Sequence, residues 1–72
     1  MTTQANAVWT VDAYGRTIQQ AANEFAETNW QSPRKATKVE PDGTFKLKDG
    51  VSTYRVWLER SSNPPVYVVT RL

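Results

Sequence analysis

The shortness of the chain constrains its fold most, because 72 residues can bury only one hydrophobic core. The sequence contains no Cys and no His, so neither a disulfide nor an ordinary zinc site can staple that core. We therefore expect one small domain over residues 1–72. Its stability must come from packing, from oligomerisation or from a partner.

The N-terminal sequence MTTQANAVWT lacks the basic and apolar regions of a signal peptide. No apolar run approaches the roughly 20 residues that span a bilayer. The absence of Cys suits a reducing compartment. Together these features predict a soluble cytoplasmic protein with no membrane partner.

The first half of the chain changes from a strand pattern to a helix pattern. Residues 7–12 alternate apolar and polar side chains, which predicts a short strand. From about residue 14 the apolar period becomes helical, and the predicted helix face comprises Ile18, Ala21, Ala22 and Phe25. Pro33 disfavours helical geometry at the residue before it, so the helix must end ahead of it.

Two starts are open for this helix. Thr17 and Gln20 have the spacing of a capping box. Alternatively, Asp12 caps a helix that begins earlier and brings Tyr14 onto the apolar face.

Strand patterns fill the rest of the chain. KATKVE (35–40) and TFKLK (44–48) flank PDG, in which Pro41 suits a turn and Gly43 can adopt a positive φ. A second hairpin joins TFKLK to STYRVWLER (52–60), and VYVVTRL (66–72) forms the last strand. The sequence thus predicts an α+β domain of order β-α-β-β-β-β, with one antiparallel sheet, one helix packed on one face and the other face open.

The predicted core joins the inward side of the strands to the apolar face of the helix. From the strands it takes Trp9, Val11, Val39, Phe45, Leu47, Tyr54, Val56 and Leu58, and from the helix Ile18, Ala21, Ala22 and Phe25.

The residue inventory argues against an enzyme. Without His and Cys, the commonest general base and the cysteine nucleophile are excluded. The carboxylates fall in turns, on the polar side of the helix or beside Lys and Arg, where solvated residues are expected. Three isolated glycines cannot build a phosphate-binding loop. We expect a protein without catalytic residues, cofactor or metal.

The open face of the sheet is the predicted interaction site. Residues 34–72 carry eight basic and four acidic residues, whereas residues 1–33 carry one and three. Alternation places Lys46, Lys48, Arg55 and Trp57 on the open face, together with Glu59. The last strand is apolar on both sides, so it contributes either Val66, Val68 and Thr70 or Tyr67, Val69 and Arg71.

If the second set points outward, an aromatic and aliphatic patch with a basic rim results. The predicted partner-binding residues are then Trp57, Tyr67, Arg55, Arg71, Lys46 and Lys48. A plainer interpretation makes Trp57 and Tyr67 cross-strand neighbours whose rings shield backbone hydrogen bonds. A shifted register would instead turn Trp57 into the core.

These features favour a non-enzymatic protein-binding module, regulatory or inhibitory, that occludes a partner surface. Its type resembles the small inhibitors of phages and mobile elements, such as anti-CRISPR and anti-restriction proteins, which implies a nucleic-acid-processing complex as partner. Self-association into an oligomer is the other protein-binding option. The alternative function is binding of single-stranded nucleic acid or RNA by the same basic and aromatic face.

One segment carries a family resemblance. KVEPDGTFKLKDGVSTYRVWL (38–58) is similar to the strand pair of the dodecins, which are flavin-storing shells of β-α-β-β chains. The resemblance implies a flavin-binding oligomer. The chain departs from that family by lacking the Ser-rich helix entry, by adding a strand after SSNPP and by placing Trp30 several residues before the strand.

Overall fold

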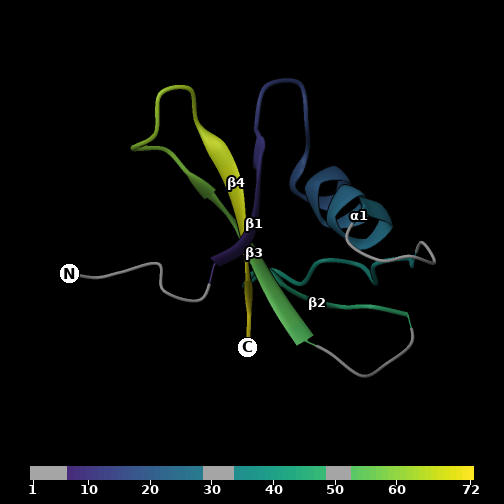
Figure 1. Cartoon of the computed structure of the whole chain (residues 1–72). Helices are drawn as coiled ribbons and strands as arrows, with labels where there is room; N and C mark the ends of the chain where they lie inside the picture. The colour runs from purple at the N-terminus through teal and green to yellow at the C-terminus, as the bar shows by residue number, and fades with distance from the viewer. Residues whose placement is uncertain (1–6, 29–33, 49–52) are drawn as a thin grey trace.

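The computed structural model describes residues 7–28, 34–48 and 53–72. Its strands pair into one antiparallel sheet in the order β1-β4-β3-β2. The helix α1 packs on one face of this sheet, and no described helix or strand lies over the other (Figure 1). The predicted α+β architecture with an open face is confirmed for these elements. Their bounds are β1 Ala7–Asp12, α1 Ile18–Thr28, β2 Thr44–Lys46, β3 Thr53–Glu59 and β4 Val66–Arg71.

The predicted strand at residues 35–40 is wrong, and the described sheet has four strands instead of five. Only Ala36 forms a bridge there, with Leu47. The ladder breaks at Thr37, whose N–H donates to the carbonyl of Lys46 at 2.8 Å. The N–H of Lys46 returns a bond to the hydroxyl of Thr37 at 2.9 Å, not to its carbonyl. A side chain thus replaces the backbone acceptor that a regular antiparallel pair requires.

A side chain of the helix forms hydrogen bonds with the backbone groups of Thr37 and Val39 that the sheet does not pair. Gln19 Nε2 donates to the carbonyl of Thr37 at 3.1 Å, and Gln19 Oε1 accepts from the N–H of Val39 at 2.8 Å. The Gln19 carboxamide therefore makes the two hydrogen bonds that a neighbouring strand would otherwise make with these backbone groups. The segment is tied to both layers without joining the sheet as a strand.

The later of the two predicted helix starts is confirmed. The N–H of Gln20 donates to Thr17 Oγ1 at 3.1 Å, and the N–H of Thr17 donates to Gln20 Oε1 at 2.7 Å, which completes a capping box. Asp12 instead accepts the N–H of Tyr14. Tyr14 is 88% exposed, so it does not reach the apolar face of the helix.

The core lies between α1 and the sheet, with Phe25 at its centre. The Phe25 ring lies 4.9 Å from the ring of Tyr54 and 5.7 Å from that of Trp9, measured between centroids. Of the predicted core residues, seven are buried: Ala21, Ala22, Phe25, Phe45, Leu47, Tyr54 and Val56. Trp9, Val11 and Val39 pack against them while partly buried.

The core prediction is wrong for two residues at the edge of the core. Ile18 is 37% exposed, because it begins the helix and lies at the edge of the layer. Leu58 is half-buried near the end of β3. Three buried hydrophobic residues of the described chain were not predicted as core: Ala26, Val68 and Val69.

The PDG turn confirms the predicted role of Gly43. The N–H of Gly43 donates to the carbonyl of Glu40 at 2.8 Å, and Gly43 has a φ of 92°. A Cβ atom at this position would lie 2.5 Å from the carbonyl oxygen of Val56. Gly43 is therefore required both by its backbone conformation and by the close approach of β3.

We expect Gly43→Ala to lower the free energy of unfolding by about 2–4 kcal/mol, because left-handed strain and a backbone clash combine. Gly15→Ala is the matched control, since Gly15 has a φ of 73° but no atom within 4 Å of the added Cβ. That variant should lose only about 1 kcal/mol, the conformational part. Denaturant titration of both variants measures the difference in their free energies of unfolding. Equal losses would show that the contact of the added Cβ with the Val56 carbonyl does not destabilise the fold.

Candidate functional site

Strand pairing defines the sheet face opposite the helix, here called the open face. Residues directly opposite each other in an antiparallel pair share a face. Phe45 pairs with Tyr54 and Val56 with Val69, and all four belong to the core under α1. The pairs between them therefore point the other way. The described open face comprises Ala7, Thr10, Asp12, Thr44, Lys46, Thr53, Arg55, Trp57, Glu59, Val66, Val68 and Thr70.

Three of the predicted site residues lie together on the open face. Trp57 is half-buried, and the side chains of Arg55 and Lys46 are exposed. Arg55 and Trp57 are two residues apart on β3 and therefore share a face, and Lys46 lies on the adjacent strand β2. Lys48 is exposed beyond the end of β2, so strand pairing does not hold it on this face.

Placing Tyr67 and Arg71 on the open face is wrong. Tyr67 pairs with Leu58 and Val11, packs against the core and donates its hydroxyl to the carbonyl of Arg16 at 3.3 Å. It also lines a separate hollow of about 270 Å³ with Leu58 and two prolines. Arg71 pairs with the core residue Tyr54, so it starts on the helix side of the sheet, where its side chain is exposed.

The strand β4, which is apolar on both sides in the sequence, has a buried valine on each face. Val69 is 0% exposed on the helix side, and Val68 is 5% exposed on the open face. Val68 lies between its cross-strand partners Trp57 and Thr10. The predicted shielding pair of Trp57 with Tyr67 is therefore wrong, and Trp57 flanks a valine instead. Part of the cover over β4 comes from the chain itself.

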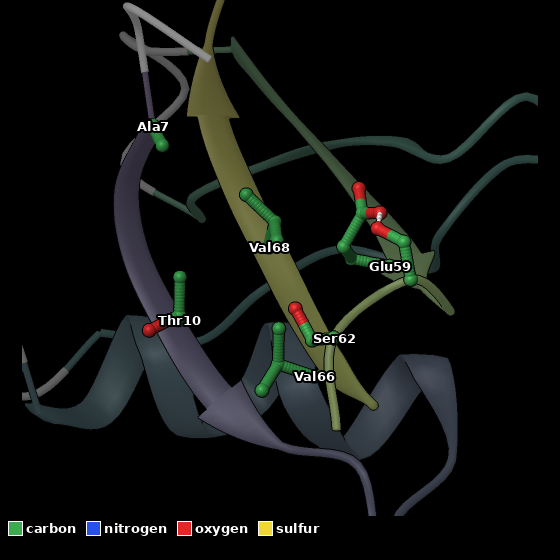
Figure 2. Close-up of a pocket in the computed structure, with 7 residues that line it drawn as sticks. Ala7, Thr10, Glu59, Ser62, Val66 and Val68 are labelled. Carbon is green, nitrogen blue, oxygen red and sulfur yellow. Dashed lines mark hydrogen bonds between the residues drawn. The ribbon is translucent and has the colours of Figure 1, made fainter. Parts of the chain in front are cut away.

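A pocket of about 390 Å³ opens on this face. Figure 2 shows its floor on β4 and β1, where Val66, Val68 and Thr10 project from the sheet, with α1 behind it. Glu59, at the end of β3, and the loop that follows it form the other wall. The lining is Ala7, Thr10, Glu59, Ser61, Ser62, Val66 and Val68. The pocket, named the Val68 pocket below, is an apolar floor with one carboxylate at its rim.

Glu59 is held by two neighbouring donors. The hydroxyl of Ser61 donates to Glu59 Oε2, and the indole Nε1 of Trp57 makes a long bond of 3.5 Å to Oε1. These bonds, that of Ser61 foremost, lower the pKa of Glu59 below its ordinary value, because they stabilise the charged form. No cation among the described residues pairs with this carboxylate. The charged carboxylate of Glu59 thus lines the pocket and can accept further hydrogen bonds.

Sequence reasoning missed the pocket. The set Val66, Val68 and Thr70 was one of two options for the last strand, and nothing in the strand itself separates them. Ser61 and Ser62 belong to a loop whose path alternation does not predict. The signal that was present is the spacing of Trp57, Glu59 and Ser61, which are two residues apart each time.

The chain matches no protein-family model, and no curated protein or solved structure matches it. Among residues 7–28, 34–48 and 53–72, no three Asp or Glu side chains cluster in a way that would hold a metal ion. No helix of this described part is long and apolar enough to cross a membrane. Trp30, which the dodecin resemblance concerns, lies outside the described residues.

We expect Ser61→Ala to raise the pKa of Glu59 toward its ordinary value, because the main donor to the carboxylate is removed. A carboxyl group with a depressed folded pKa stabilises the fold above its unfolded pKa and loses that contribution as the pH falls through the folded one. Ser61→Ala should therefore flatten the acid limb of stability. Carboxyl-carbon NMR titration measures the pKa, with Ser62→Ala as control from the same pocket wall. An unchanged pKa of Glu59 in the Ser61→Ala variant would show that Ser61 is not the cause of its lowering.

Proposed function

We propose that the chain is a non-enzymatic protein-binding module that docks through its open face and so occludes a surface of its partner. The single observation that carries this proposal is the position of Trp57. Its indole lies half-buried beside the Val68 pocket, on the face that no described element covers. Trp and Arg are enriched among the residues that dominate binding energy.

The surroundings of Trp57 suit a protein partner. Val66, which is half-buried opposite Glu59, supplies apolar surface that a partner can desolvate further, whereas Val68 beside the ring is already buried. Arg55 and Lys46 are exposed on the same face and give orientation and long-range attraction. A regulatory or inhibitory role by occlusion requires only such a surface and no catalytic group.

The structure makes the nucleic-acid alternative more demanding. A stacking platform needs successive aromatic rings, and Trp57 is the ring that the described open face offers once Tyr67 is assigned to the helix side. Glu59 lies next to it on the same face and would repel a phosphate backbone. The protein-binding proposal needs neither a second ring nor an unbroken basic surface.

Two arginines form a matched pair for a test. Arg55 and Arg71 are both exposed and lie at neighbouring registers of β3 and β4, but on opposite sides of the sheet. With immobilised protein and extract of the producing cells, we expect Arg55→Ala to lower the recovery of a captured partner about fivefold, the loss that defines a substantial interface residue. Arg71→Ala should leave recovery unchanged. Equal losses would place the interface elsewhere.

The same variants decide between the two partner classes. We expect no binding of mixed-sequence RNA or single-stranded DNA oligonucleotides at moderate salt. Binding with a steep salt dependence that Lys46→Ala flattens would replace the proposal with the nucleic-acid alternative.

A further inference from the structure

The Val68 pocket combines an apolar floor with a charged rim. Among its lining residues Ala7, Val66 and Val68 have only apolar side chains, which favour aliphatic groups. Its rim carries Glu59, the one charged residue among those described as lining it. A neutral apolar group would leave the negative charge of the carboxylate without a cation, and an anion would be repelled by it.

The volume limits the size of the occupant. At about 390 Å³ the pocket lies at the low end of the range for ligand sites, about 300–1,000 Å³. It therefore has room for a small group, such as one long side chain of a partner, more readily than for a cofactor. A long side chain with an aliphatic stem and a positive end matches both the floor and the rim.

We infer that the Val68 pocket receives a lysine side chain from the partner protein. Its methylene groups lie on Val66 and Val68, and its ammonium group donates to the carboxylate of Glu59. This inference rests on the proposed function, because it states what the partner brings to the open face.

The existing bonds of Glu59 favour lysine over arginine. One carboxylate oxygen already accepts from Ser61, and the other accepts the long bond from Trp57. A guanidinium fork binds best when both oxygens are free in one plane, whereas an ammonium group needs a single free lone pair. The two donors also hold the carboxylate in place, so less side-chain entropy is lost on binding.

The test uses small probes on the isotope-labelled chain. Nα-acetyl-lysine methylamide is titrated and followed by amide chemical shifts, with Nα-acetyl-norleucine methylamide as the uncharged probe of similar shape. We expect the lysine probe to shift the amides of Glu59, Ser62 and Val68 first. We expect it to bind about two- to fivefold more tightly than the norleucine probe, the contribution of one solvent-accessible ion pair.

Glu59→Gln keeps the shape of the side chain and removes its charge. It should abolish the preference for lysine, whereas Glu27→Gln, the same change on the exposed side of α1, should leave it intact. Equal binding of the two probes, or a preference that survives Glu59→Gln, overturns the inference. An arginine probe that binds more tightly than the lysine probe overturns the choice of lysine.

Failure of the inference and failure of the proposed function are distinguishable. If Arg55→Ala lowers partner recovery but the lysine probe does not perturb the pocket, the inference fails and the docking face stands. If the probe binds as expected but Arg55→Ala and Arg71→Ala recover equal amounts of partner, the pocket stands and the docking face fails. A dimer in sedimentation velocity that both Arg55→Ala and Glu59→Gln dissociate would replace the lysine with Arg55 of a second copy.

Discussion

The packing of Phe25 is the interaction on which the rest of the structure depends. Its ring touches rings from three strands, Trp9 on β1, Phe45 on β2 and Tyr54 on β3. A single helix thereby fixes one face of the sheet as the core, and no second helix among residues 7–28, 34–48 and 53–72 covers the other. The open face is a consequence of this one-sided packing. Its residues must therefore be compatible with water or with a partner.

The register of β4 then decides what the open face contains. Tyr67 and Val68 are adjacent, so only one of them can point to each side. On the helix side, Tyr67 reaches the carbonyl of Arg16 with its hydroxyl and satisfies a polar group at the border of the core. Val68 is consequently left on the open face beside Trp57. The open face therefore presents one ring next to an aliphatic pocket instead of two aromatic rings.

The sequence was sufficient where local physics acts alone. The period of the helix, its capping box and the PDG turn each depend on residues close in the chain, and all three are present. It was insufficient where two solutions were locally equivalent. Both sides of β4 are apolar, so only pairing with β1 and β3 selects the side of Tyr67. Residues 35–40 alternate like a strand, but the hydroxyl of Thr37 and the carboxamide of Gln19 take over hydrogen bonds that a regular strand would form with backbone groups.

The open face is electrically polar along β3, and this polarity bears on recognition. Arg55 precedes Trp57 by two residues and Glu59 follows it by two, so the ring lies between opposite charges. Lys46 strengthens the positive end from β2, and the Val68 pocket lies at the negative end. A partner with the opposite polarity is attracted in one orientation and repelled when it is turned by half a revolution. The apolar surface around Trp57 supplies contact area without direction, and the charges on either side of it supply the direction.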